Sequence, residues 1–321
     1  MNMHNKPLYR LMILCGVTVV FCFIYLFLGL DFEIFEYQFT SRLRKLILIL
    51  LVGGAIGTST VIFQAITVNR LLTPSIIGLD AVYIFSKVLV LFIFGTSSIW
   101  VTHLYINFSI SLIIMIIFAL LLFEGIFKFG QFSVYFILLI GVILGTFFRS
   151  FTGFLELLIN PEDFLAIQSA MFANFDASNP LLVTLCAIVL SILFVITLVC
   201  LPYLDVLLLG RAQAINLGVN YAALVRFLFI LVALMVAVAT SLVGPITFLG
   251  LLAINIAHEF IKTFEHRYML PATLFVSWIS LLLGQWVIEN IFEATTQVSI
   301  LINLIGGVYF IYLLIRRRTT T

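Results

Sequence analysis

Charged residues are scarce in this sequence. Asp, Glu, Lys and Arg make up only 9% of its 321 residues, whereas apolar types make up 64%; a soluble domain carries roughly 25% charged residues. So little charge cannot cover a water-facing surface, and the main solvent is therefore lipid. The apolar residues fill whole segments, as in lipid-facing or bundle-buried helices. These continuous runs exclude a porin-type barrel, whose strands alternate polar and apolar residues.

The sequence also lacks a residue pattern typical of a metal site or a disulfide. The four cysteines all lie inside apolar runs, without a C-x-x-C pair: Cys15, Cys22, Cys186 and Cys200. Buried thiols of this kind behave as small apolar side chains, so we expect neither a disulfide nor a metal site. His258-Glu259 resembles the start of a zinc-protease motif, but the second histidine is replaced by Lys262.

Motifs for nucleotides, catalysis and nucleic acid are missing as well. No G-x-x-x-x-G-K-[ST] motif occurs, and the small-residue stretch 53–60 lacks the lysine that would contact phosphate. Its glycines instead predict a close helix-packing face. No basic run suits nucleic acid. We expect no catalytic residue, no metal and no cofactor on this chain.

Hydropathy predicts about ten membrane-spanning helices in a single all-α domain, residues 1–321. The first apolar run follows Lys6 and Arg10 and has no small-residue cleavage site, so we interpret it as an uncleaved helix. An outer loop with a helical piece is expected at 154–179, and a polar connection at 204–221. The predicted spans are 10–30, 43–64, 76–96, 104–126, 131–153, 180–203, 222–243, 247–262, 270–291 and 297–315.

The distribution of basic residues predicts the orientation. With ten spans and both termini cytoplasmic, the inner side carries eleven basic residues and the outer side four, which agrees with the positive-inside rule. The inner set is Lys6, Arg10, Arg70, Lys128, Arg211, Arg226, Lys262, Arg267, Arg316, Arg317 and Arg318. The outer set is Arg42, Arg44, Lys45 and Arg149.

Three of these outer basic residues form a cluster that departs from the rule. Arg42, Arg44 and Lys45 stand together at the outer start of the second span. One interpretation is a docking site for an acidic partner. The other is that they extend to lipid headgroups or pair with Glu33 and Glu36.

One ionisable residue lies well inside a predicted span. Lys87 would cost about 2.5–3.5 kcal/mol on insertion scales, and such residues usually face a bundle interior or a water-filled cavity. Asp80 is two turns earlier on the same helix face, so an ion pair or proton relay is one hypothesis. A purely structural lysine is the other.

Two stretches of the sequence carry several short motifs each. The first, residues 42–78, contains R-L-R-K, L-V-G-G-A, F-Q and L-T-P-S-I-I-G. The second, residues 209–272, contains L-G-R-A-Q-A-I-N-L-G-V, V-G-P-I-T-F-L-G-L and H-R-Y-M-L-P-A. In order and spacing these motifs resemble the FecCD-type permease family of iron–siderophore, haem and cobalamin ABC importers, and the match extends weakly over nearly the whole chain.

The resemblance implies a cobalamin-permease-like fold of ten spans in the bacterial plasma membrane. It also implies a second permease, two cytoplasmic ATPase subunits that bind ATP and Mg, and an extracytoplasmic binding protein. Arg42 and Lys45 occupy the family's two basic positions for docking the binding protein, although Arg44 replaces the proline between them. The segment that matches the family's ATPase-coupling helix contains Gly210, Arg211, Ala214, Leu217 and Gly218.

Departures from the pattern point to one subgroup. Ile254-Asn255 stands where P-H is common, and Gln285 replaces an acidic residue of span nine. With Gly306-Gly307, these features resemble permeases for catechol-type siderophores, which often work beside a non-identical second permease. The expected function is import of a ferric siderophore. Haem or cobalamin import, an ion-coupled transporter and an intramembrane enzyme are the alternatives.

Overall fold

The computed structural model describes residues 6–28, 35–128, 134–168, 171–175, 179–293 and 296–318. Within these ranges the chain is helical and contains no strand. The side chains at 123–128, 134, 135, 137, 166, 167, 314 and 316–318 lie outside the description. Lys128 and Arg316 to Arg318, which entered the orientation prediction, are among them.

Ten longer helices follow the ten predicted spans in order. They are α1 (Lys6–Phe27), α2 (Phe35–Thr67), α3 (Leu79–Phe94), α5 (Leu104–Lys128), α6 (Val134–Leu158), α8 (Pro180–Leu207), α10 (Tyr221–Val243), α11 (Leu249–Ile261), α12 (His266–Asn290) and α13 (Val298–Arg318). Within the described residues, seven of these helices are long and apolar enough to cross a membrane, namely α1, α2, α5, α6, α8, α10 and α12. The prediction of a multi-spanning all-α protein is confirmed.

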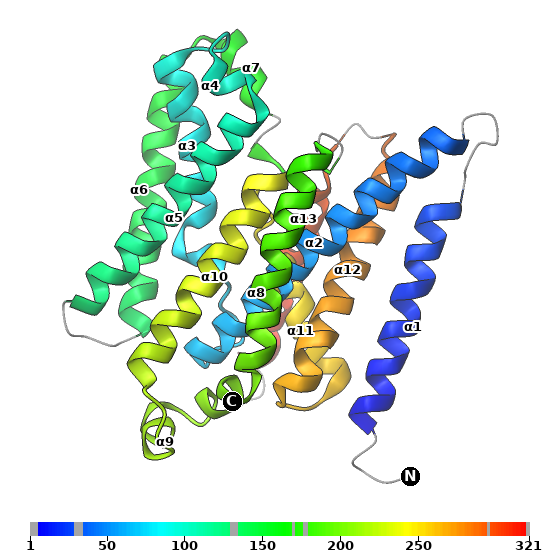
Figure 1. Ribbon diagram of the computed structural model, residues 1–321, viewed down its shortest axis with the longest axis vertical. Coiled ribbons are helices and arrows are strands. Elements are labelled where there is room, and N and C mark those ends of the chain that lie inside the picture. The colour runs from blue at the N-terminus through cyan, green and yellow to red at the C-terminus, as the bar shows by residue number, and fades with distance from the viewer. Residues whose placement is uncertain are drawn as a thin grey trace.

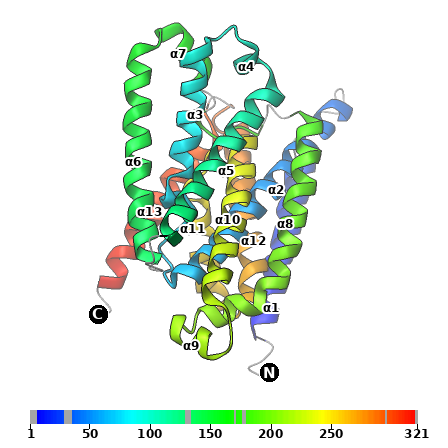
Figure 2. The ribbon, with the colours of Figure 1, turned by 60° about the vertical axis from the view of Figure 1, so that its left-hand side comes forward.

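Short helices mark the two ends of the bundle. The helices α4 (Ile99–Thr102) and α7 (Pro161–Gln168) lie at one end, and α9 (Arg211–Asn216) lies at the other (Figure 1). Helix α7 is the helical piece expected in the loop 154–179. The start of α1 and the end of α13 lie at the α9 end (Figure 2), as the prediction of both termini on one side requires.

Helix α2 runs through the centre of the bundle. In its most apolar stretch of 18 residues, 83% of the residues are buried inside the protein. The share is 17% in the corresponding stretch of the peripheral helix α1. Small residues let α12 approach closely, because a Cβ on Gly53 would lie 3.0 Å from the side chains of Ser277 and Leu281. Ser277 Oγ also donates to the Gly53 carbonyl at 2.8 Å. The predicted packing face on α2 is therefore confirmed.

A tight turn separates α2 from α3. A one-turn helix, η3 (Pro74–Ile77), ends at Gly78, whose φ of 89° is left-handed. A Cβ at Gly78 would lie 2.7 Å from the Gly145 backbone of α6, so only glycine fits there. Hydropathy alone predicted one continuous span from 76 to 96 and missed this break.

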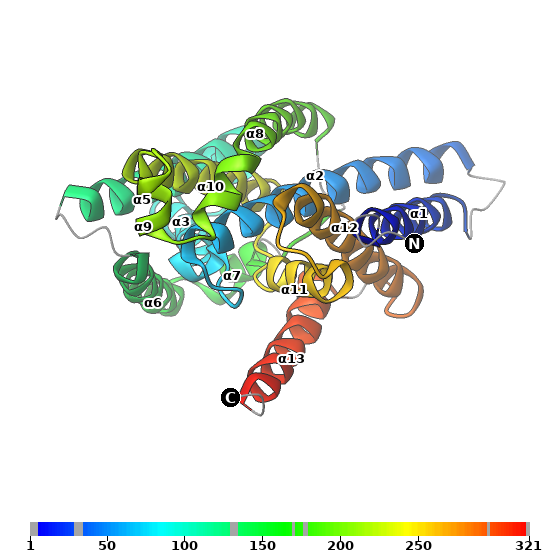
Figure 3. The same ribbon diagram turned by 90° about the horizontal axis from the view of Figure 1, so that it is seen from below.

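Helix α13 projects from the rest of the bundle when the molecule is seen from below (Figure 3). Its main contacts are with α11 and α12. Its exposed side chains include Leu304 and Val308, which are 64% and 63% exposed. The face is apolar, as expected for a surface that meets lipid or another membrane protein.

Candidate functional site

The segment around α9 has a rigid local structure. Gly210, with a φ of 90°, is its N-cap residue, and Gly218, with a φ of 82°, follows its last turn. Val219 N–H donates to the Ala214 carbonyl at 3.1 Å, and Gly218 N–H to that of Ile215 at 2.9 Å. This pair of bonds is a Schellman motif, which closes a helix by satisfying its last carbonyls. The two predicted glycines therefore define both ends of α9.

The side chains around α9 expose an apolar surface. Ala214 is fully buried and anchors the helix, which packs mainly against α8 and α10. Leu209, Ile215 and Leu217 are 56%, 50% and 61% exposed. We call these three side chains the α9 surface. Figure 2 shows α9 beyond the ends of the long helices, so these exposed side chains belong to a segment outside the main bundle.

Arg211 has a local role next to the α9 surface. Its guanidinium carbon lies 5.9 Å from the centroid of the Tyr221 ring, at the start of α10. This distance permits a cation–π contact, which contributes about 0.5–1 kcal/mol at exposed sites. The contact joins the two sides of the loop that carries α9.

A polar contact links α8 to α12 near the same segment. Asp205 Oδ1 accepts a hydrogen bond from the His266 backbone N–H at 2.9 Å, and His266 Nδ1 lies 2.7 Å from the same oxygen. The His266 side chain is 7% exposed and that of Asp205 is 44% exposed. The two residues are 61 positions apart, and no sequence motif predicted the pair.

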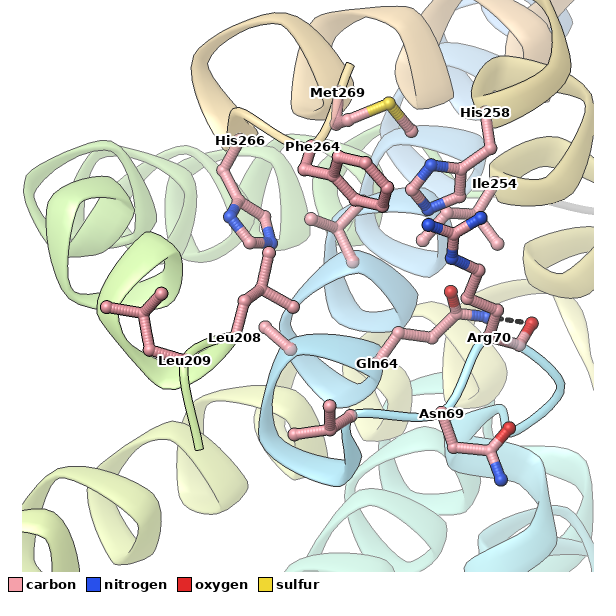
Figure 4. Close-up of a pocket in the computed structure, with 13 residues that line it drawn as sticks. Gln64, Asn69, Arg70, Leu208, Leu209, Ile254, His258, Phe264, His266 and Met269 are labelled. Atoms are coloured by element: carbon pink, nitrogen blue, oxygen red, sulfur yellow. Dashed lines mark hydrogen bonds between the residues drawn. The ribbon is translucent and has the colours of Figure 1, made fainter. Parts of the chain in front are cut away.

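A cavity of about 360 Å³ lies beside this contact. Figure 4 shows Leu208, Leu209 and His266 on one side and His258 on the other. Gln64 Nε2 donates to the Arg70 carbonyl at 2.7 Å, which ties the loop after α2 to the cavity wall. The cavity therefore separates the start of the α9 surface from α11.

At the opposite end, Arg42 binds its own chain. Its Nη1 donates to the Tyr25 carbonyl at 3.2 Å and to the Leu28 carbonyl at 2.6 Å. These carbonyls lie at the C-terminal end of α1, where no further backbone N–H of the helix can donate to them. Arg42 thus caps α1 from α2.

Lys45 forms an ion pair within the protein. Its Nζ lies 2.8 Å from Glu289 Oε1, near the end of α12, and the two side chains are 19% and 20% exposed. The same oxygen accepts bonds from Tyr25 Oη at 3.1 Å and Gln285 Nε2 at 2.7 Å. Glu289 thus gathers three donors from three helices.

The rest of the outer basic cluster differs in exposure. The Arg44 side chain is exposed, whereas Arg42 and Lys45 are half-buried. Glu33, one of the two predicted acidic partners of the cluster, lies outside the described ranges. Within this cluster, Arg44 is therefore the residue whose charged side chain is exposed.

The structure does not bring Asp80 and Lys87 together. Lys87 Nζ is hydrogen-bonded to Asn107 Oδ1 and lies 5.2 Å from the Tyr83 ring centroid. Asp80 Oδ2 accepts from Thr247 Oγ1 at 3.1 Å. Each buried polar group therefore has its own tertiary partner. Across the described part of the chain, no group of three His, Cys, Asp or Glu residues could hold a metal ion.

These features define a class of protein: a multi-pass helical membrane protein with an apolar surface at one end and no metal-ligand cluster among its described residues. A profile of the FecCD transport family matches residues 10–316. The chain therefore belongs to the FecCD transport family. The resemblance noted from the sequence motifs is confirmed.

Individual relatives match over nearly the whole chain. The petrobactin import system permease protein YclO of Bacillus subtilis is 43% identical over 307 residues, covering 96% of this chain and 97% of the relative. The ferric enterobactin transport system permease protein FepD of Escherichia coli is 30% identical, covering 87% and 81%. A solved structure of an inward-facing metal-chelate type ABC transporter is 26% identical, with a TM-score of 0.83 and coverage of 96% and 99%.

Proposed function

We propose that this chain is the membrane-spanning permease of an ABC importer that moves a ferric catechol-type siderophore into the cytoplasm. The observation that carries the proposal is 43% identity, over nearly the full length, to a permease named for import of petrobactin, a catechol-type siderophore. The relative named for ferric enterobactin supports the same class of cargo. Haem and cobalamin are the alternative cargoes.

The proposed assembly has four further subunits. They are a second, non-identical permease, two ATPase subunits that hold ATP and Mg, and a siderophore-binding protein outside the membrane. The whole of this chain, 1–321, acts as one permease domain in the bacterial plasma membrane, and the two permeases enclose one transport path. Both termini face the cytoplasm in this arrangement. Hydrolysis takes place on the ATPase subunits and not on this chain.

The α9 surface is the proposed contact with an ATPase subunit. Gly210 and Gly218 hold α9 at the end of the bundle, and Ala214 anchors it. Leu217 and its apolar neighbours would then enter a groove of the partner. A short, closed helix suits this role, because it can pass on a displacement without unwinding.

The outer basic cluster is the proposed dock for the binding protein. Arg44 can meet an acidic residue directly, because it is exposed. Arg42 and Lys45 can do so only by leaving partners that they already have within the chain. Docking at Lys45 would therefore exchange Glu289 for a carboxylate on the binding protein.

Uptake of radioactive iron by iron-starved cells tests the proposal. Iron is given as a ferric catechol siderophore to cells that lack the gene, carry it intact or carry it with Arg44→Glu. We expect that iron uptake requires the gene, continues in the presence of an uncoupler, and stops when the ATPase is lost. Uptake that stops with the uncoupler alone would indicate an ion-coupled transporter. Uptake of labelled haem or cobalamin in place of the siderophore would reassign the cargo.

A further inference from the structure

Asp205 caps helix α12 from another helix. Helix α12 begins at His266, and the carboxylate of Asp205 accepts its first backbone N–H at 2.9 Å. The N-terminus of a helix carries partial positive charge, which favours a carboxylate there. Glu265, the N-cap residue, makes no cap bond, and its carboxylate binds Arg267 Nε at 2.5 Å. Asp205 therefore supplies a cap that the local sequence does not.

The His266 ring strengthens the same contact. A carboxylate can only accept hydrogen bonds, so the Nδ1 atom 2.7 Å away carries the proton. One oxygen of α8 thus holds both the backbone and the side chain of the first residue of α12. We call this arrangement the Asp205–His266 clasp.

Packing at the end of α8 is uneven. Leu204 and Leu207 are 0% and 1% exposed in the core, whereas Leu208 and Leu209 face the 360 Å³ cavity, with His258 of α11 across it (Figure 4). A gap of about 0.5–1 Å already loses a quarter to a half of a dispersion contact, so Leu208 and Leu209 contribute little across the cavity. The clasp is therefore a polar connection from α8 to α12 that adds to the packing of the buried leucines.

The clasp also reaches helices that α9 does not. Helix α9 packs mainly against α8 and α10, whereas α12 packs against α1, the central α2, α11 and α13. We propose that Asp205 is a positioning residue for coupling: through His266 it makes the end of α8 and the start of α12 move together when α9 is displaced. The inference rests on the proposed function, in which an ATPase subunit moves α9.

Three substitutions distinguish the effect of the Asp205–His266 clasp on coupling from a general loss of stability. Asp205→Asn keeps the size of the side chain and removes its charge. His266→Phe keeps a ring and removes the Nδ1 donor. His266→Asn places an amide N–H where Nδ1 stood and serves as the rescue variant. Only complexes that retain their ATPase subunits after purification from the native host are compared.

The first measurement does not depend on the cargo. Spin labels replace Gln213, an exposed polar position of α9, and Arg267 at the start of α12, in a chain whose native cysteines are changed to serine. With the intact clasp, the distance distribution between the labels stays narrow when ATP and vanadate are added. In Asp205→Asn and His266→Phe it broadens, and in His266→Asn it stays narrow. Equal distributions in all four proteins would overturn the proposal.

The second measurement uses the same complexes in proteoliposomes with a binding protein and a labelled ferric catechol siderophore. The expected result is about a five-fold or greater fall in iron imported per ATP hydrolysed for Asp205→Asn and His266→Phe, as loss of a charge-assisted hydrogen bond allows. His266→Asn restores most of it. An unchanged ratio in both defective variants would overturn the clasp. A complex with the intact clasp that imports no iron would overturn the proposed function, while the label distances still decide the clasp.

Discussion

The two ends of this permease use opposite chemistry on their surfaces. At the end away from α9, Arg42 and Lys45 bind the end of α1 and Glu289 of α12, although the family resemblance predicted that they dock a binding protein. At the other end, α9 is held by its own backbone bonds and leaves Leu209, Ile215 and Leu217 exposed.

The difference shows what each end can offer a partner. An apolar surface is available without breaking any contact, so it suits a subunit that stays bound. A charge that is already paired must exchange partners, so it suits a protein that binds and leaves. In the proposed function, the α9 end would therefore suit a permanent ATPase contact, and the end that carries Arg44 would suit a transient dock.

The largest expected effect comes from a charge in the α9 surface. Leu217→Asp should lower co-purification of the ATPase subunit about thirty-fold, because a central apolar contact of an interface contributes about 2 kcal/mol or more. Gln213→Glu adds the same charge on an exposed polar position of α9 and serves as the control. Pull-down through a tag on this chain measures both. Equal retention of the ATPase in the two variants would remove the α9 surface from the interface.

The ion pair between Lys45 and Glu289 is expected to stabilise the folded protein. Lys45→Gln leaves Glu289 without its cation in a half-buried place, and should lower the free energy of unfolding by about 1–2 kcal/mol, between exposed and fully buried pairs. The double variant with Glu289→Gln should recover part of this loss. Thermal unfolding in detergent gives the coupling energy from the four proteins. Additive single effects would show that the pair contributes nothing.

Arg44 should affect docking and not stability. Arg44→Glu is expected to weaken association of the loaded binding protein about five-fold, since one exposed charge pair contributes roughly 1 kcal/mol or less. The effect should shrink at high salt because exposed charges are screened. Lys6→Glu, at the opposite end, is the matched control. A binding isotherm on purified complexes measures the change, and an equal loss with Lys6→Glu would argue against a local dock.

The smallest effect tests the closure of α9. Gly218→Ala puts a Cβ on a residue with a φ of 82° and no atom within 4 Å, so strain alone should cost about 1 kcal/mol. Gly218→Asn should cost less, because asparagine tolerates this backbone region. Iron uptake should fall no more than a few-fold for alanine and less for asparagine. A larger loss with asparagine would show that the backbone conformation is not the cause.

Local patterns in the sequence predicted much of this structure. Continuous apolar runs indicated the helices, and small residues at Gly53 and Gly57 indicated the close face of α2. The resemblance to the family's coupling segment pointed to Gly210 and Gly218, which the structure places at the two ends of α9 with positive φ. Each of these signals depends on residues that are near one another in the chain.

The contacts that hold the two ends together could not be predicted in this way. Lys45 meets Glu289 across 244 positions, and Asp205 meets His266 across 61. Proximity in sequence even misled at α3, where Lys87 was a candidate partner for Asp80 but binds Asn107 of the next long helix. Such partners are determined by tertiary packing. The periodicity of a single helix gives no information about which residue of another helix lies opposite.

Thiol labelling of the assembled complex tests the contrast between the ends most directly. Leu217→Cys and Arg44→Cys are made separately in a chain without native cysteines, and each is treated with a membrane-impermeant reagent in purified complexes. We predict that the ATPase subunit protects position 217 and that the loaded binding protein protects position 44. Protection at the opposite positions, or at neither, would contradict the assignment of the two ends.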